Sequence, residues 1–299
     1  MTQAKHRLDI LAITLLLILC ISWGGQQVAV KLIIDEVPPL MQATIRSMGA
    51  MVLVAVWCRW RGRSPIIWDG TLWWGVGAGV LFSLEFLLVY WGLTYTSASR
   101  AVIFIYLSPF VVAIGSQWLI PEESLNRTQF LGLGLAFFGI VIAFGESSTR
   151  PSHQMLVGDL MLTLSAVFWG ATTLLIKVSP LAHIEASRTL LYQLAVSAMI
   201  LPLASLFLDE PMVTSLSSTA LWSLLYQTIW VAAVTYLVWY WLVTHYPACQ
   251  LSSFTFLAPL FGVLAGGWIL DEPLTTALLA ALVLVGSGLY LVNRSKSPQ

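Results

Sequence analysis

Charged side chains are scarce in this sequence. The 299 residues include 14 basic and 14 acidic side chains, 9% charged in all, while 58% are hydrophobic and the mean hydropathy is +0.85. Ordinary soluble domains carry about 25% charged residues. The low content excludes a water-soluble globule, because too few polar side chains are present to cover its surface. It also excludes intrinsic disorder, and the balanced charge without a basic patch argues against nucleic acid as a partner.

Cysteine and histidine are also few. Cys20, Cys58 and Cys249 lie in apolar runs without a CxxC pair, so we expect buried free thiols. The four histidines are scattered, which leaves no metal-ligand spacing, and we expect neither a metal nor a cofactor. Walker A, HExxH and GxSxG patterns are absent, which disfavours nucleotide hydrolysis and an intramembrane enzyme.

Long apolar runs fill the chain instead. A membrane-spanning helix needs about 20 mainly apolar residues. Ten runs meet this requirement, over residues 9–33, 40–60, 71–94, 98–120, 128–145, 156–178, 184–208, 218–244, 248–270 and 275–292. Continuous runs satisfy the backbone in a bilayer only as helices, whereas the strands of a β-barrel alternate in short segments. The sequence therefore predicts an all-α polytopic membrane protein with ten transmembrane helices, the first an uncleaved helix rather than a signal peptide.

Basic residues in the loops predict the orientation. With the N-terminus inside, the inner side holds Lys5, Arg7, Arg59, Arg61, Arg63, Arg127, Lys177, Arg294 and Lys296. The outer side then holds only Lys31, Arg100 and Arg150. We therefore expect a multi-pass protein of the cytoplasmic (inner) membrane with both termini in the cytoplasm and the lipid bilayer as its surroundings.

The second half of the chain repeats the first. Residues 90–122 align without a gap to residues 240–272, with nine identities in 33 positions that include proline, glutamate and two tryptophan pairs. We expect repeats over 1–147 and 148–299, five helices each, within one integral membrane domain. An odd number of spans inverts one repeat relative to the other, and inverted repeats are typical of transporters that work by alternating access.

The repeated residues carry a family resemblance. They are Trp23-Gly24 with Trp169-Gly170, Arg46 with Arg188, and Pro109 with Pro259, each proline followed 13 residues later by Glu122 or Glu272. The chain thereby resembles the drug/metabolite transporter superfamily in its ten-helix EamA-type branch. Many members have Asn two residues after the Trp-Gly pair, where this chain has Gln26 and Thr172. The resemblance implies a secondary transporter of small metabolites or drugs, and the aromatic amino acid exporters are one such branch.

Glu85 is the sharpest candidate for transport. It lies near the middle of the third span, where an ionisable group is costly and faces a cavity or a partner. It could contact a substrate ammonium, carry a proton or form a structural hydrogen bond between helices. The aligned residue of the second half is Thr235, so any role of Glu85 is asymmetric.

The other candidates for a substrate-binding cavity are aromatic or polar residues within the spans. They are Trp23, Gln26, Tyr90, Tyr106, Trp169, Thr172, Tyr236 and Tyr240. Packing is the alternative for each. Arg46 and Arg188 could clamp a carboxylate, although their presence in both halves favours a structural contact.

Residues near the helix ends have expected structural roles. Pro109 and Pro259 are expected to kink their helices as hinges. We expect Glu122, Glu123, Asp271 and Glu272 to cap the next helix and Lys31 and Lys177 to be interfacial anchors.

The leading hypothesis is export of a small, zwitterionic or weakly charged molecule, with amino acids, aromatic ones included, as first candidates. Multidrug or lipophilic-cation efflux is the alternative, because a carboxylate beside an aromatic wall also suits a cation. A channel is disfavoured by the sparse polar residues. Proton coupling through Glu85 and facilitated diffusion both remain open. No obligate protein partner is evident.

Overall fold

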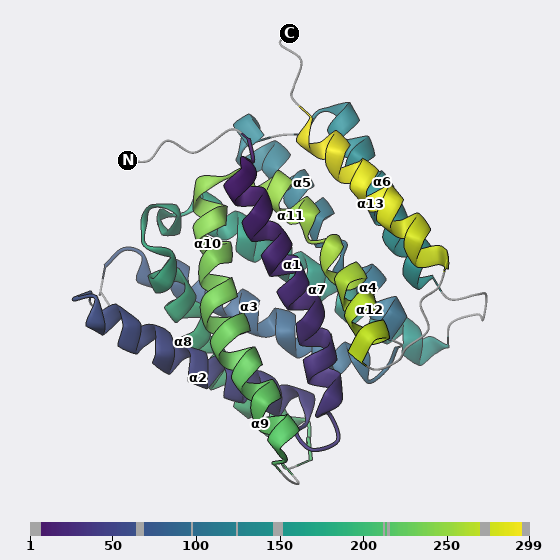
Figure 1. The fold of residues 1–299 in the computed structure, drawn as a ribbon. Coiled ribbons are helices and arrows are strands. Elements are labelled where there is room, and N and C mark those ends of the chain that lie inside the picture. Colours follow the sequence, from purple (N-terminus) through teal and green to yellow (C-terminus); the bar gives the residue numbers. More distant parts are fainter. Residues whose placement is uncertain are drawn as a thin grey trace.

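The computed structural model describes residues 7–63, 69–96, 98–123, 125–145, 152–211, 213, 216–269 and 276–294, without the side chains of 98 and 99. These residues form helices and connecting segments, with no strand among them (Figure 1). The helices are α1 (Ile10–Leu32), α2 (Pro39–Trp60), α3 (Leu72–Leu93), α4 (Ala98–Ile105), α5 (Ser108–Leu119), η1 (Pro121–Glu123), α6 (Arg127–Phe144), α7 (His153–Val178), η2 (Pro180–His183), α8 (Ala186–Phe207), α9 (Ser218–Leu225), η3 (Tyr226–Thr235), α10 (Tyr236–His245), α11 (Ala248–Phe254), α12 (Leu257–Ile269) and α13 (Thr276–Asn293).

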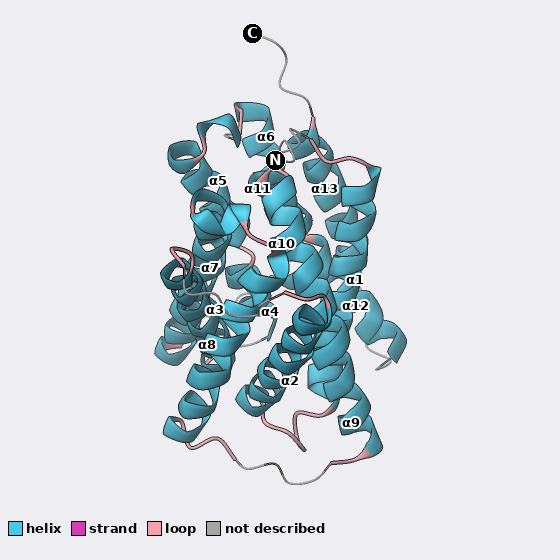
Figure 2. Cartoon of the chain, turned by 90° about the vertical axis from the view of Figure 1, so that its left-hand side faces the viewer, coloured by secondary structure: helices cyan, strands magenta, loops and turns pink. Residues whose placement is uncertain are grey.

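Ten stretches of 18 to 28 helical residues within this described part are long and apolar enough to cross a membrane. Large apolar side chains such as Trp118, Leu131 and Phe207 are at least 71% exposed on the outside of the bundle. Lipid tails solvate such a surface, whereas water would not. The predicted all-α, ten-span architecture is confirmed. The start of α1 and the end of α13 lie at the same end of the bundle (Figure 2).

The fourth and ninth spans are each broken into two helices. The chain leaves the helix after Ile105 and re-enters it at Ser108, and it does the same between Phe254 and Leu257. Proline lacks the N–H that would bond to the carbonyl four residues earlier. Pro109 leaves the Ile105 carbonyl without its helical donor and Pro259 does so for Thr255, so both breaks begin beside the carbonyl that loses its bond. The expected kinks are present; a hinge function stays a prediction.

The eighth span contains a π-helical segment, η3, between α9 and α10. At its end the Tyr236 N–H donates to the Val231 carbonyl, five residues earlier instead of four. The wider turn changes the direction in which the following residues of α10 point. The pattern of apolar residues in the sequence does not predict this π-helical segment.

Matched glycines bring the first helix of each predicted repeat against the fourth span of the other. A Cβ on Gly24 of α1 would lie 2.7 Å from the Ala258 carbonyl oxygen, and one on Gly170 of α7 would lie 2.7 Å from the Val111 Cβ and 3.3 Å from the Ser108 carbonyl oxygen. Only glycine permits such close approach. Position 108 aligns with 258 in the repeat, so the two interfaces use equivalent sites. Both Trp-Gly pairs therefore lie at close helix contacts.

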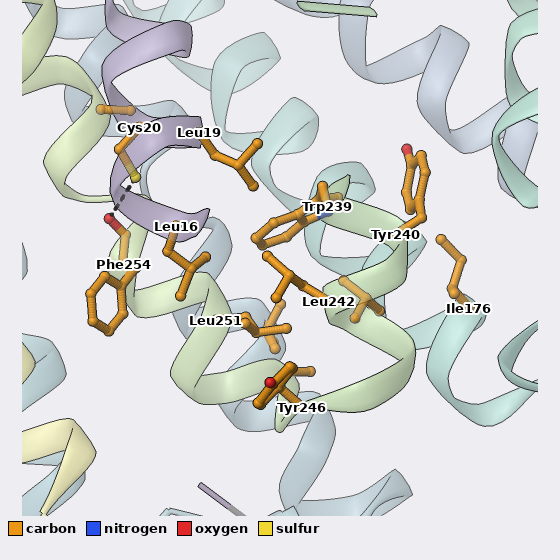
Figure 3. Close-up of a cluster of buried hydrophobic side chains, with 14 of the residues drawn as sticks. Leu16, Leu19, Cys20, Ile176, Trp239, Tyr240, Leu242, Tyr246, Leu251 and Phe254 are labelled. Atoms are coloured by element: carbon orange, nitrogen blue, oxygen red, sulfur yellow. Dashed lines mark hydrogen bonds between the residues drawn. The ribbon is translucent and has the colours of Figure 1, made fainter. Parts of the chain in front are cut away.

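A large apolar core joins α1, α10 and α11. Figure 3 shows Leu16 and Leu19 of α1 pointing toward Trp239 and Leu242, and the Cys20 thiol donates to the Phe254 carbonyl at 3.3 Å. The three cysteines are free and buried, as expected.

The predicted roles of Lys177 as an interfacial anchor and of Glu123 as a cap of the next helix are wrong. Lys177 is 8% exposed, forms an ion pair with Glu123 at 2.9 Å and donates to the Val243 and Tyr246 carbonyls, so it is an interhelix contact rather than an interfacial anchor. Glu123 accepts from the Ala248 N–H at 2.7 Å and therefore caps α11, far along the chain. The next helix, α6, is capped by Asn126 and Gln129 instead. Asp271 and Glu272 lie outside the described residues.

A polar contact also joins the α2–α3 connection to the start of α8. Arg188 forms an ion pair with Asp69 at 2.5 Å, and its side chain also donates to the Thr71 hydroxyl. Hydrogen bonds from Arg188 and Thr71 lower the pKa of the Asp69 carboxyl from 3.8 to about 2. Arg188 is thus a helix-end contact, as the structural interpretation of this residue predicted.

Candidate functional site

A cavity of about 170 Å³ lies between α1, α3, α7 and α10, with one residue contributed by the break between α4 and α5. Its wall consists of Trp23, Gln26, Gln27, Phe82, Glu85, Phe86, Tyr106, Trp169, Thr172, Thr173, Tyr236, Trp239 and Tyr240. Both predicted repeats contribute to it. A volume of this size holds on the order of half a dozen water molecules at ~30 Å³ each. It lies below the roughly 300–1,000 Å³ of drug-sized pockets.

Glu85 supplies the carboxylate of the cavity. Phe82 and Phe86, one turn and one residue away on α3, line the cavity on either side of it. Helical spacing places positions 82, 85 and 86 on one face. No hydrogen bond from any described residue reaches the Glu85 carboxylate, so this group is available to a ligand. An ionisable group at this depth without a hydrogen-bond partner among the described residues fits a functional role better than a structural one.

Trp23 forms part of the wall on α1. Its indole N–H donates to the Thr235 hydroxyl at 3.0 Å, and its ring meets Trp239 edge to face with centroids 5.5 Å apart. Thr235 in turn donates to the Val231 carbonyl at the end of η3. Thr235, the last residue of the π-helical segment η3, therefore fixes the position of the Trp23 indole. Adjacent Gly24 lies against α12 instead.

Trp169 and Tyr106 form the opposite wall. Their rings meet edge to face at 5.9 Å, and Tyr106 also lies 6.3 Å from Phe256, its aligned residue in the other half. Thr172 donates to the Phe168 carbonyl, within its own helix. The break before Pro109 leaves Tyr106 outside regular helix, where its ring reaches the cavity.

Tyr236, Tyr240 and Gln26 add polar atoms. The Tyr240 hydroxyl donates to the Gln193 amide oxygen at 2.6 Å, so its orientation is fixed. Across the described part of the chain, no hydrogen bond occupies the Gln26 amide, which therefore faces the cavity with donor and acceptor free. Tyr236 packs against Trp23 and Phe82, with centroids at 6.3 and 6.0 Å.

Eight of the nine predicted site residues thus line one cavity. The ninth, Tyr90, does not reach it and stacks on Phe86 with centroids 6.2 Å apart. Whether the eight residues bind substrate stays a prediction.

Five lining residues were missed by sequence reasoning. They are Gln27, Phe82, Phe86, Thr173 and Trp239. Trp239 lies three residues after Tyr236, and the two phenylalanines lie on the face of Glu85, so helical periodicity could have indicated them. Gln27 and Thr173 merely adjoin predicted residues.

The cavity offers one carboxylate, two amides and several hydroxyls within aromatic walls. Among the described residues, no cluster of three or more histidine, cysteine, aspartate or glutamate side chains could hold a metal ion. Such a site can bind a small molecule with a positively charged group and an apolar part.

Comparison with known proteins identifies the kind of molecule that has this fold. Residues 10–145 and again residues 156–294 match the EamA-like transporter family. The uncharacterized transporter YvbV of Bacillus subtilis is 28% identical over 288 residues, which cover 95% of this chain and 92% of that protein. A probable amino-acid metabolite efflux pump of Escherichia coli is 27% identical, over 93% of each chain.

A solved crystal structure shares the fold. It aligns with a TM-score of 0.79 at 18% identity and covers 94% of this chain and 95% of its own. The named relatives are transporters, which confirms the expected class and excludes an enzyme. Two matches to one family, over nearly the whole chain, show that this multi-pass membrane protein belongs to the EamA-like transporter family.

Proposed function

We propose that this transporter exports small organic metabolites, amino acids first among them, across the cytoplasmic membrane. The observation that carries the proposal is the Glu85 carboxylate, which lines a small aromatic cavity and has no hydrogen-bond partner among the described residues. The ammonium group of an amino acid matches this carboxylate, and its side chain matches the aromatic wall. Two relatives, in Escherichia coli and Salmonella typhimurium, are named probable amino-acid metabolite efflux pumps, which supports the substrate class.

Transport is proposed to occur by alternating access of two inverted five-helix repeats, residues 1–147 and 148–299. The matched glycine contacts of α1 and α7 support this arrangement, as does the twofold match to one family. The breaks before Pro109 and Pro259 lie at equivalent positions, where rotation of a half-span could open one side of the cavity. The predominance of basic residues at one end supports cytoplasmic termini.

Efflux of lipophilic cations is the second candidate. Three tryptophans and a carboxylate around one cavity would also attract an organic cation. The volume of about 170 Å³ favours the smaller substrate.

Counterflow in proteoliposomes tests the proposal. Vesicles preloaded with unlabelled amino acid should accumulate labelled amino acid, and lipophilic cations should exchange weakly or not at all. Exchange of cations without any amino acid would refute the leading proposal and support the second.

The variant Glu85→Gln tests the carboxylate. Removal of a charged hydrogen bond, at roughly 1.5–3 kcal/mol, should lower the affinity for an amino acid by about 10- to 100-fold. Asp209→Asn is the matched control, because Asp209 is exposed and its φ of 48° suits asparagine as well as aspartate. An unchanged affinity and pH dependence in Glu85→Gln would make Glu85 structural.

A further inference from the structure

Arg46 is the most completely buried charged side chain near the cavity. It lies on α2 and is 1% exposed. The guanidinium carbon lies 4.4 Å from the centroid of the Phe86 ring and 5.9 Å from that of Tyr236. Stacking on these rings compensates the charge over the face of the guanidinium. It leaves the N–H groups at the edge without acceptors.

Both terminal nitrogens of Arg46 are buried and have no hydrogen-bond partner in the described chain. Glu85, Tyr90 and Tyr236 lie within electrostatic range, yet none of the ion pairs between described residues joins Arg46 to Glu85. A guanidinium carries five donors, and buried donors without acceptors are costly. Arg188, the corresponding arginine of the other half, donates hydrogen bonds to Asp69, Thr71 and Tyr192. The unsatisfied state is therefore particular to Arg46.

The position of Arg46 relates it to the cavity. Phe86 and Tyr236, the two rings that contact its guanidinium, both line the cavity, although Arg46 itself does not. The guanidinium thus lies one side chain behind the wall, on the side of Glu85. Phe86 is therefore the side chain that would have to move for the guanidinium to reach the cavity.

We propose that Arg46 is the carboxylate-binding residue of the cavity, reached when the Phe86 ring moves aside, and that it binds the substrate carboxylate while Glu85 binds the ammonium. The planar fork of a guanidinium matches two carboxylate oxygens, which the single acceptor of a hydroxyl or amide would not satisfy. A substrate carboxylate would supply the missing hydrogen-bond acceptors of both terminal nitrogens. This inference rests on the proposed function, because it assigns the second charge of the same substrate.

Three probes separate the two charges of the substrate. L-Phenylalanine carries both, phenethylamine carries only the ammonium and 3-phenylpropanoate carries only the carboxylate, with the same ring in each. Their dissociation constants are measured by titration calorimetry on the full chain in detergent, for the wild type and for Arg46→Gln, Arg46→Lys and the control Arg188→Gln.

Arg46→Gln should weaken binding of L-phenylalanine and 3-phenylpropanoate by about 10- to 100-fold and leave phenethylamine unchanged or tighter. Arg46→Lys keeps the charge without the fork and should lose less, again only for the carboxylates. Arg188→Gln should bind all three probes like the wild type. If Arg46→Gln does not fold, Arg46→Lys decides by the same comparison.

Equal weakening of all three probes, unchanged binding of the carboxylates, or a wild type that binds neither carboxylate would overturn the proposal. The proposed function fails separately. Arg46-dependent binding of 3-phenylpropanoate without exchange of any amino acid would keep the subsite and reject amino acid transport. Exchange of amino acids at equal rates by the wild type and Arg46→Gln would reject the Arg46 subsite and keep amino acid transport as the function.

Discussion

Gly24→Ala tests whether close approach of α1 and α12 builds the cavity wall. The added Cβ would lie 2.6 Å from the Gly262 nitrogen, 2.7 Å from the Ala258 carbonyl oxygen and 2.8 Å from the Phe261 carbonyl carbon. All three are backbone atoms, so no side chain can rotate away. Ordinary contact begins at 3.4 Å, and the two helices must therefore separate by about 0.8 Å.

This separation is expected to lower both the stability of the fold and the affinity for a ligand. A radial gap of about 0.5–1 Å forfeits a quarter to a half of each affected dispersion contact, and overpacking of this kind lowers the free energy of unfolding by about 1–3 kcal/mol. The same shift would move Trp23, next to Gly24 on α1, relative to Thr235 on η3 and so disturb their 3.0 Å hydrogen bond. One neutral hydrogen bond is worth about 1 kcal/mol, so affinity for a cavity ligand should fall about fivefold if the ligand needs Trp23 in place.

Thermal unfolding in detergent, followed by circular dichroism, measures the first effect, and ligand titration measures the second. Gly134→Ala is the matched control, because a Cβ there would meet nothing within 4 Å. It should be neutral or stabilising by up to about 1 kcal/mol, as expected for alanine in an open helix position. If Gly24→Ala unfolds at the same temperature as Gly134→Ala, the Trp-Gly pair does not act by close packing and the reasoning fails.

Two further predictions concern the hinges and the α8 end contact. Replacing both Pro109 and Pro259 with alanine should restore the two lost helical hydrogen bonds. Counterflow should then slow at least about tenfold, which corresponds to roughly 1.4 kcal/mol on the barrier, while equilibrium binding stays unchanged. Unaltered counterflow rates would exclude a hinge role. The pKa of Asp69 in the folded protein is about 2, below its ordinary value of 3.8. Ionised Asp69 therefore stabilises the folded protein above about pH 4, and this contribution disappears as the pH falls toward 2. Asp69→Asn should therefore flatten the decline of the unfolding temperature between pH 4 and pH 2, and an unchanged profile would show that the contact with Arg188 does not stabilise the fold.

The spans could be predicted from the sequence because the bilayer imposes a single rule on every apolar run. The site could be predicted for the same reason, since a polar group such as Glu85 within a span needs a cavity or a partner. The breaks were only partly visible. Pro109 and Pro259 indicate that a helical hydrogen bond is lost, but not where the chain leaves the helix. That point depends on the position of the freed carbonyl.

Contacts between distant segments could not be predicted. Lys177 has no sequence feature that points to Glu123, 54 positions earlier, because the pairing depends on how α7 and α11 meet at one end of the bundle. Tyr90 was misplaced because alignment with Tyr240 equates sequence positions and not environments. Tyr240 reaches Gln193, whereas Tyr90 packs behind Phe86.

The two halves of the chain share their glycine packing but differ in the charges near the cavity. Gly24 and Gly170 make equivalent contacts in the two halves, but Thr235 stands where the first half has Glu85.

The two arginines diverge in the same way. Arg188 is paired at a helix end and Arg46 is left without acceptors beside the cavity. The first half of the chain thus carries both charges near the cavity, one of each sign, while both halves supply aromatic surface. A zwitterion has one ammonium and one carboxylate joined by a short link, so a single unrepeated pair, Glu85 with Arg46, matches it where two copies of either charge would not.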